Sequence, residues 1–170
     1  MSALEQFEIS FFNLQDGLHD FDFTIEDAFF QSFENSIVEK GSGQCKVTLD
    51  KKSNLLTFDI SLEISVELVC DRSLKEFQFP IVSQKQLVVK FGEEEMEVAD
   101  DILMIKSDAR TINLSQVIYE YISVEIPMKK IHPDYLRDNE DEFGEIIYKS
   151  EEGQSKDEID PRWNALKNLN

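Results

Sequence analysis

The sequence predicts an α+β domain with two main helices on a largely antiparallel sheet, whose roughly six to eight strands can curl toward a barrel. Three observations lead to this class. The stretch 58–70 alternates strictly between apolar and polar residues. Shorter stretches with the same period of two lie on both sides of it. Two stretches with helical spacing, 24–41 and 113–127, interrupt the strands.

The strongest strand signal is the stretch 58–70, which predicts a long strand with one face buried and one face in water. The stretch 45–49 alternates in the same way, and the polar residues DKKSN lie between the two. A polar connection between two strands of matching period predicts a hairpin. The predicted buried face of the long strand consists of Phe58, Ile60, Leu62, Ile64, Val66, Leu68 and Cys70.

The other strand candidates are shorter. The N-terminal stretches 7–11 and 21–25 alternate, and the turn-forming residues NLQDG between them predict two strands joined by a short turn. After the turn DRS, the stretch EFQFPIV contains Pro80, which indicates a strand end or an edge strand. The stretch EEEMEVADD predicts a solvated acidic loop, and QKQLVVKFG, ILMI and RTIN predict further strands.

Both predicted helices have recognisable ends. The first has Thr24 as its N-cap and Gly41 as its end, and we expect its phenylalanine stripe to pack on the sheet. The second has Asn113 as its cap and stops at Pro127. The stripe of the first helix comprises Phe29, Phe30, Phe33 and Ile37.

The composition changes sharply after residue 133. From 134 to 160 there are 11 acidic and three basic residues, with few apolar ones. Such a segment buries too little apolar surface to offset the entropy cost of ordering it. We therefore expect a folded domain at 1–133, an acidic and mostly disordered linker at 134–159, and a short helix at 160–170.

The last eleven residues, DPRWNALKNLN, contain the chain's single tryptophan. Asp160 suits the N-cap and Pro161 the first helical position. A helix this short is marginal alone in water, so it needs a groove, either on its own domain or on a partner. Because Trp and Arg often dominate interface energies, Arg162, Trp163 and Leu166 join Asp160 and Pro161 as candidate partner-binding residues.

The charge balance limits the classes of partner that the chain can attract. The chain has 17 Lys and Arg against 35 Asp and Glu, a net charge of −18. Such a chain repels RNA and anionic membranes over long range and attracts basic proteins. The N-terminus lacks the pattern of a signal peptide, and no apolar run is long enough to span a membrane. We therefore expect a cytoplasmic protein without membrane contact.

Signs of catalysis are sparse. The six glycines form no phosphate-binding loop. Cys45 and Cys70 fall on the buried phase of strands, where each is expected to be a small hydrophobic residue. The two histidines, His19 and His132, are isolated, and no acidic stretch has the spacing of a calcium loop. We expect no enzyme, cofactor, metal or small-molecule substrate.

Three stretches, in order, resemble one family. VELVCDRSLKEFQFP resembles a turn at a strand end, RTINLSQVIYEYISVEIPMKKIHP a later helix, and DPRWNALKNL a C-terminal signature. Over roughly residues 45–170 the chain is similar to the YceD family of large ribosomal RNA subunit accumulation proteins. The resemblance implies a role in 23S rRNA accumulation, and it adds Cys70 and Arg72 as residues of the turn motif. Ser73 replaces a cysteine found in many members, which argues against a metal or redox pair.

Together these lines predict a non-enzymatic factor in large-subunit biogenesis. Its acidic surface and Trp163 helix would bind a basic ribosomal protein or an assembly factor, with contact to rRNA being indirect. An alternative is an RNA-binding factor that uses a local basic patch near Arg72 and Lys129–Lys130. An enzyme acting on RNA is a third hypothesis.

Overall fold

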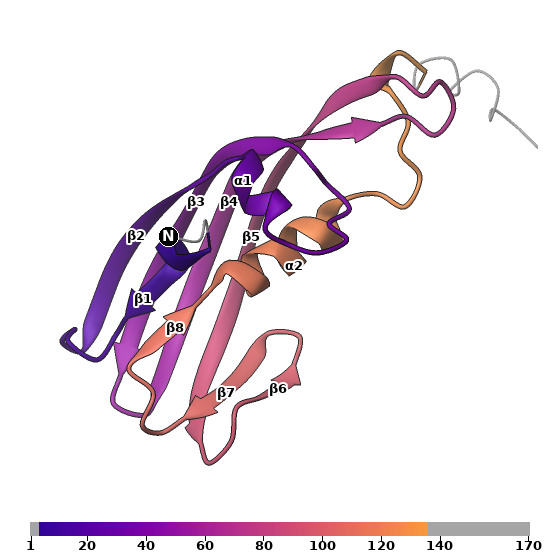
Figure 1. Ribbon diagram of the computed structural model, residues 1–170. Helices are drawn as coiled ribbons and strands as arrows, with labels where there is room; N and C mark the ends of the chain where they lie inside the picture. Colours follow the sequence, from indigo (N-terminus) through magenta and orange to yellow (C-terminus); the bar gives the residue numbers. More distant parts are fainter. Residues whose placement is uncertain (1–3, 136–170) are drawn as a thin grey trace, which may run out of the picture. The chain divides into compact units, whose positions relative to one another are not determined.

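The computed structural model describes residues 4–135 (Figure 1). The chain divides after Pro133 into two units, and the fold below is that of the first. The predicted helix at 160–170, and all but the first two residues of the predicted linker at 134–159, lie outside the described residues.

The fold is α+β, with six strands in one mixed sheet and two in a smaller one. The large sheet has the order β2-β3-β4-β5-β7-β6, and β1 pairs with β8. All neighbours are antiparallel except β5 and β7. The elements are η1 (Glu5–Phe7), β1 (Glu8–Ser10), β2 (Gly17–Ile25), α1 (Asp27–Gln31), β3 (Gly41–Lys52), β4 (Leu55–Val69), β5 (Glu76–Gly92), β6 (Met96–Ala99), β7 (Ile102–Lys106), β8 (Thr111–Asn113) and α2 (Ser115–Glu125).

The expected curl toward a barrel is wrong, because the sheet stays open. β2 and β6 lie at opposite ends of the strand order and do not pair. Closure requires the two edge strands to meet along their length. β6 has only four residues, all exposed, against nine in β2. The expected acidic loop at 93–101 is also wrong in part, because it contains this edge strand.

The predicted hairpin is confirmed and is longer than expected. β3 and β4 pair from Gly41↔Val66 to Lys52↔Leu55, which leaves a two-residue turn. Gly43 is required by close approach, since a Cβ there would lie 2.4 Å from the carbonyl oxygen of Glu63. Every second residue of β4 from Leu56 to Leu68 is buried, as the alternation predicts.

β5 is one strand of 17 residues rather than the two short strands expected. It pairs with β4 along most of its length, with Ser65 opposite Pro80. On its other side it pairs with β7 only from Val88 to Gly92. The segment around Pro80 therefore lies at an edge, where a missing N–H costs no ladder bond. This confirms the edge interpretation of the proline.

The expected N-terminal hairpin is wrong. β2 pairs with β3 over its whole length, whereas β1 pairs with β8 through Ile9↔Ile112. The apolar residues Phe7, Ile9 and Phe11 are all buried. Packing this segment over the sheet, rather than beside β2, buries its three apolar side chains and leaves Glu8 and Ser10 exposed.

The first helix is much shorter than its sequence pattern suggests. α1 ends at Gln31, and Asn35, which lies inside the predicted helix, has a left-handed backbone with φ 58° that an α-helix does not contain. Ile37, expected on the buried stripe, is 51% exposed. Gly41, expected as the helix end, begins β3, where its N–H donates to Asp27 Oδ1 at 2.9 Å. Thr24, the expected cap, belongs to β2.

The second helix is confirmed. α2 covers Ser115–Glu125 and ends before Pro127, as predicted. The N-cap is Leu114 rather than the expected Asn113. Asn113, one residue earlier, accepts a hydrogen bond from the Ser115 N–H at 2.9 Å.

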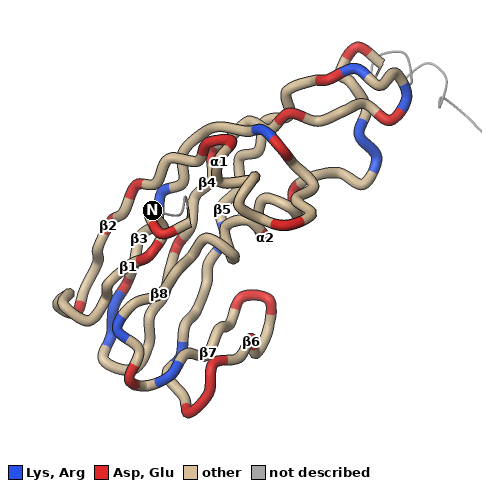
Figure 2. The backbone as a smooth tube through the Cα atoms, viewed as in Figure 1, with Lys and Arg blue, Asp and Glu red and all other residues tan. Residues whose placement is uncertain are grey.

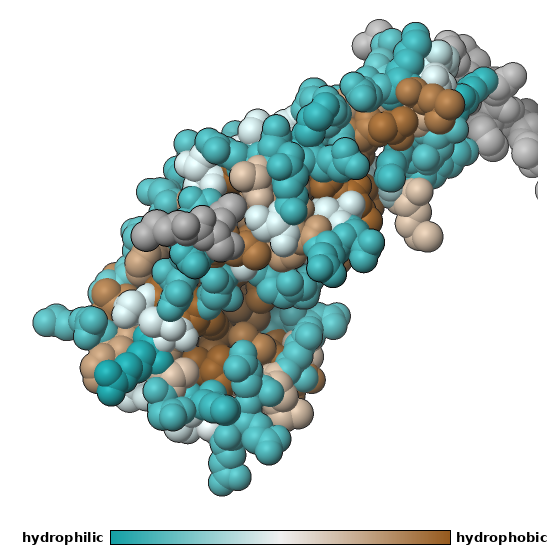
Figure 3. Space-filling model, in the orientation of Figure 1, coloured by the Kyte–Doolittle hydropathy of each residue, from teal (hydrophilic) through white to brown (hydrophobic). Residues whose placement is uncertain are grey.

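The large sheet has one covered and one open face. Figure 1 shows α1, α2, β1 and β8 all lying on the same side of the large sheet. On that side apolar side chains gather between the covering segments, with hydrophilic ones around them (Figure 3). The largest fully buried side chains are Phe7, Phe29, Phe30, Phe58, Ile9, Ile25, Leu49, Leu56, Ile60, Leu62, Leu114 and Ile118.

Candidate functional site

The turn between β4 and β5 contains the predicted motif residues Cys70 and Arg72. The Cys70 N–H donates to the Lys75 carbonyl oxygen, and the Leu74 N–H donates to the Cys70 carbonyl oxygen, both at 2.9 Å. Leu74 has a left-handed backbone with φ 57°. These bonds close a compact turn that holds Arg72 on its exposed outer side.

A segment that follows α2 makes hydrogen bonds to one side of this turn. The Asp71 N–H donates to the Lys130 carbonyl oxygen at 2.8 Å, and the Lys130 N–H donates to Asp71 Oδ2 at 2.7 Å. The His132 N–H donates to Cys70 Sγ at 3.3 Å. The His132 ring meets the Phe77 ring edge to face, with centroids 5.6 Å apart. We call residues 70–75 and 128–132 together the cysteine turn.

The Cys70 thiol is buried yet favours ionisation. Its pKa is lowered from the ordinary 9.0 to about 7, with the Ser73 hydroxyl as the largest cause; burial opposes it, and backbone N–H groups add to it. The buried Ser73 oxygen has no other hydrogen-bond partner within residues 4–135. By contrast, burial raises the pKa of Cys45 to about 12. Both cysteines are buried, as predicted, but their chemistry differs.

The cysteine turn gathers positive charge. Arg72 and Lys75 come from the β4–β5 turn, and Lys129 and Lys130 come from the segment bonded to it. We call these four residues the basic cluster. The exposed side chain of Leu74 lies in the same turn. The structure thus brings together the patch that sequence reasoning placed near Arg72 and Lys129–Lys130.

A second site, which sequence reasoning missed, is an acidic hollow of about 400 Å³ beside α2. Tyr121 donates a long hydrogen bond of 3.4 Å to Asp101 Oδ1. Burial and the negative charge of Asp101 raise the pKa of Tyr121 to about 12, so its hydroxyl stays protonated at neutral pH. The hollow is lined by Lys85, Glu97, Asp100, Asp101, Glu120, Tyr121 and Val124.

The acidic hollow suits a cationic side chain. Its lining has four carboxylates against one ammonium, and that ammonium, Lys85 Nζ, lies 3.4 Å from Glu125 Oε1. Figure 2 shows the acidic segments gathered around β6 and the turn before it. The signal for this site was present in EEEMEVADD. Recognising it required knowing that α2 lies beside that segment.

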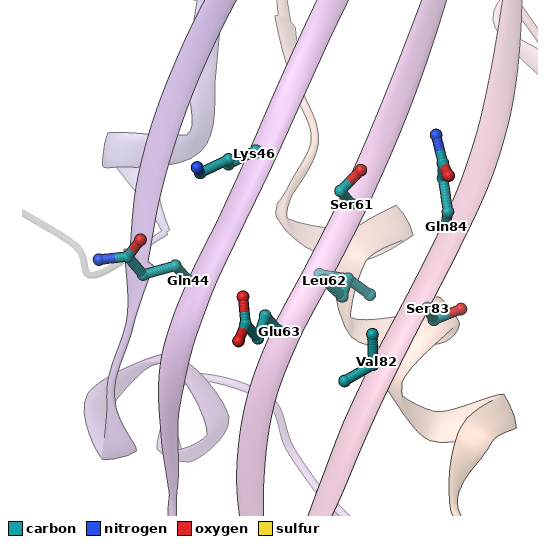
Figure 4. A pocket seen from close by; sticks show the side chains of 8 residues that line it. All are labelled: Gln44, Lys46, Ser61, Leu62, Glu63, Val82, Ser83 and Gln84. Atoms are coloured by element: carbon teal, nitrogen blue, oxygen red, sulfur yellow. The ribbon is translucent and has the colours of Figure 1, made fainter.

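A third hollow, also of about 400 Å³, lies on the open face of the sheet (Figure 4). Polar side chains of β3, β4 and β5 surround it. The Ser83 side chain points to the covered face instead, where its hydroxyl donates to Glu125 Oε1 at 2.8 Å. This surface offers hydrogen bonds together with one exposed apolar side chain, Val82. Its lining residues are Gln44, Lys46, Ser61, Leu62, Glu63, Val82, Ser83 and Gln84.

The predicted site residues therefore separate into two groups. Cys70 and Arg72 share the cysteine turn, whereas Asp160, Pro161, Arg162, Trp163 and Leu166 lie outside the described residues. Within residues 4–135, no group of three or more His, Cys, Asp or Glu side chains is placed to hold a metal ion. No helix in this part of the chain is long and apolar enough to cross a membrane.

The fold and these surfaces define an α+β domain with an open sheet face and charged surface hollows. Residues 58–170 match the family model described as large ribosomal RNA subunit accumulation protein YceD. The chain belongs to the YceD family, as the sequence motifs predicted, and that family supports ribosome biogenesis. The chain is also 27% identical over 157 residues to the uncharacterized protein YlbN of Bacillus subtilis (strain 168), covering 88% of this chain and 87% of that protein. No solved structure matches the chain.

Proposed function

We propose that this chain is a non-enzymatic factor that supports 23S rRNA accumulation by binding a basic ribosomal protein or assembly factor of the large subunit. The acidic hollow beside α2 and the Trp163 segment are the two contact regions. Family membership supports the biological role. The acidic hollow supports the choice of partner, and it is the observation that carries the proposal.

The chemistry of the hollow fits a Lys or Arg side chain. Glu97, Asp100 and Glu120 surround the hollow, and the neutral Tyr121 hydroxyl holds Asp101 in place. A cation that enters between several carboxylates is attracted by each of them. Its binding there is therefore stronger than in an isolated, exposed ion pair. Because the whole chain is also acidic, its field raises the rate of encounter with a basic protein.

The Trp163 segment supplies the apolar part of the proposed contact. A buried tryptophan anchor at an interface contributes about 2–4 kcal/mol when judged by truncation to alanine. The acidic hollow, in contrast, acts mainly through encounter rate and salt sensitivity. The two contributions are therefore separable by experiment.

The alternative, an RNA-binding factor, has one specific observation in its favour. The hydrogen bonds between Asp71 and Lys130 hold the basic cluster together on the surface. Four neighbouring cations can contact phosphates, although the surrounding charge of the chain opposes the approach of RNA.

The test is an affinity purification of the tagged full chain from growing cells, with ribosomal proteins and 23S rRNA quantified. Wild type is compared with Trp163→Ala and with the double variant Glu97→Gln, Asp100→Asn. The matched control, Glu8→Gln with Glu34→Gln, removes the same charge from exposed positions in β1 and in the loop after α1. Asp101 is left unchanged because Tyr121 bonds to it.

We expect a basic large-subunit protein to co-purify with wild type and with the matched control. Both test variants should capture less of it. Trp163→Ala should weaken capture at all salt concentrations, whereas the hollow variant should weaken it most at low salt and should lose less than wild type as salt rises. Retention of the same partner by both folded variants would overturn the proposal. If RNA is captured without any protein, and Arg72→Gln with Lys129→Gln abolishes that capture, the RNA-binding alternative replaces it.

A further inference from the structure

A third kind of surface lies at the end of the sheet where the β3–β4 turn meets two loops. Here a hollow of about 510 Å³ is lined by residues from four separate parts of the sequence. We call it the aromatic hollow. Its lining residues are Phe11, Phe12, Lys51, Lys52, Ser53, Asn54, Phe91, Ser107 and Ala109.

The hollow contains both buried and accessible aromatic rings. Phe11 and Phe91 meet with ring centroids 5.9 Å apart. Phe12 is 58% exposed, and the Arg110 guanidinium carbon lies 4.7 Å from the centre of its ring. An exposed ring beside a guanidinium offers two flat surfaces for stacking.

The loops that form the hollow are held in place by backbone bonds. The Phe12 N–H donates to the Arg110 carbonyl oxygen at 3.2 Å, which joins the β1–β2 segment to the β7–β8 loop. The Ser107 N–H donates to the Gly92 carbonyl oxygen at 3.0 Å, which joins that loop to the end of β5. The exposed ring of Phe12 is therefore positioned before any partner arrives, which lowers the entropy cost of binding.

The electrostatics of this hollow are unusual for so acidic a chain. Its lining includes two lysines and no carboxylate. Lys51 Nζ is held by the Leu14 carbonyl oxygen at 2.8 Å and by Asp16 Oδ1 at 3.2 Å. Lys52 is more exposed and lies 3.1 Å from Asp50 Oδ2. Figure 2 shows Lys and Arg segments gathered near this turn and the ends of β5 and β7.

Single-stranded nucleic acid is the ligand class that combines flat π-faces with regularly placed negative charge. Proteins bind such strands by stacking bases on aromatic rings while cations contact the phosphates. A duplex cannot use the hollow in this way, because its bases are already stacked and paired. An acidic peptide could contact the cations but would lack a planar group at every repeat.

We propose that the aromatic hollow binds single-stranded RNA, with a base stacked on Phe12 and phosphates near Lys52 and Arg110. The proposal rests on the role in rRNA accumulation, but it requires no partner protein at the acidic hollow. It also differs from the alternative considered above, because the basic cluster at Arg72 lies on a different turn.

The test measures fluorescence anisotropy of a labelled single-stranded RNA of about 12 nucleotides with the full-length chain, at low and physiological salt. A duplex of the same length is measured in parallel. Phe12→Ala should weaken single-strand binding about 5- to 10-fold, the lower range for loss of one stacked base. Lys52→Gln and Arg110→Gln should each lower the salt slope by roughly 0.7.

Matched controls separate the site from general effects. Leu18→Ala removes another exposed apolar side chain, and Lys46→Gln removes an exposed lysine from the open sheet face. Both should bind RNA like wild type. Phe12→Leu keeps most of the apolar volume but removes the ring, so it should fold more reliably than Phe12→Ala. It should bind single-stranded RNA as weakly as Phe12→Ala does.

The inference is overturned if wild type shows no single-strand binding, if it prefers duplex, or if both folded Phe12 variants bind normally. It is also overturned if Arg72→Gln removes the binding instead. None of these results affects capture of a basic partner protein, so the proposed function can stand when this inference fails, and the reverse also holds.

Discussion

The two faces of the large sheet differ in what they contribute to the protein. On the covered face of β4 every inward residue from Leu56 to Leu68 is buried. On the open face of the same strand, residues such as Asp59 and Ser61 lie in water or make surface hydrogen bonds, as Asp59 does with Gln86 at 2.7 Å. One strand therefore serves stability with one face and leaves the other free for contacts. Substitutions on the two faces and at their ends test this division, and their expected effects on stability decrease in the order given.

Phe58→Ala should be the most destabilising of these changes. The side chain is fully buried and lies between Leu49 of β3 and Leu87 of β5 in the pairing register. Removing a buried phenylalanine costs about 3–5 kcal/mol through lost burial and the cavity left behind. Urea unfolding monitored by circular dichroism would measure it. A loss below about 1 kcal/mol would contradict the assignment of this face to the core.

Gly43→Ala tests how closely β3 and β4 approach each other. A Cβ at this position would lie 2.4 Å from the Glu63 carbonyl oxygen and 2.5 Å from the Ile64 Cα. Both are backbone atoms, so the strands must shift, at a cost of about 1–3 kcal/mol. Gly17→Ala is the matched control, because Gly17 shares the positive φ that strains an L side chain (136°, against 158° at Gly43) but a Cβ there meets nothing within 4 Å. Gly43→Ala should therefore lose more stability than Gly17→Ala. Equal stability of the Gly43→Ala variant and wild type in thermal unfolding would argue against this register.

The cysteine turn predicts a pH dependence at the end of the covered face. The Cys70 pKa is lowered from 9.0 to about 7 on folding. Between pH 7 and pH 9 the unfolded chain therefore binds more protons at this group than the folded chain. Stability from Cys70 is fully present above pH 9, and it is lost as pH falls through 7.

The comparison of wild type with Cys70→Ala isolates this effect, since other groups titrate equally in both. Denaturant unfolding should show wild type gaining stability over the variant as pH rises from 7 to 9. Cys45 is the opposite case, because folding raises the pKa of its thiol from 9.0 to about 12. Its contribution to stability is fully present below pH 9 and is lost as pH rises toward 12. A constant difference between wild type and Cys70→Ala across that range would show that the thiolate is not favoured by folding.

Ser61→Ala on the open face should have the smallest effect. Ser61 is exposed in the middle of β4, between Lys46 of β3 and Gln84 of β5. Exposed substitutions of this kind change stability by less than about 0.5 kcal/mol. If instead the variant lost more than about 1 kcal/mol in the same urea assay, the open face would be part of the stabilising structure.

The sequence by itself determined the buried face of β4 and the position of α2. The period of two in β4 and the helical spacing of α2 both predicted their elements correctly. The period of two in 45–49 and 58–70 also placed Cys45 and Cys70 inside. These patterns predict burial because side-chain directions repeat regularly along a strand or helix. A buried face therefore appears in the sequence as apolar residues at a fixed spacing. Charge and motif order likewise indicated the family without any three-dimensional information.

Only the tertiary structure decided which segments meet. The pairing of β1 with β8 joins residues about a hundred positions apart, and local periodicity contains no information about such a partner. α1 also ends early at Gln31, although the phenylalanine spacing continues to Phe33. The same reason explains the surfaces: the acidic hollow, the basic cluster and the aromatic hollow each combine side chains from distant segments. Their chemistry follows from proximity, which folding creates and spacing along the chain does not reveal.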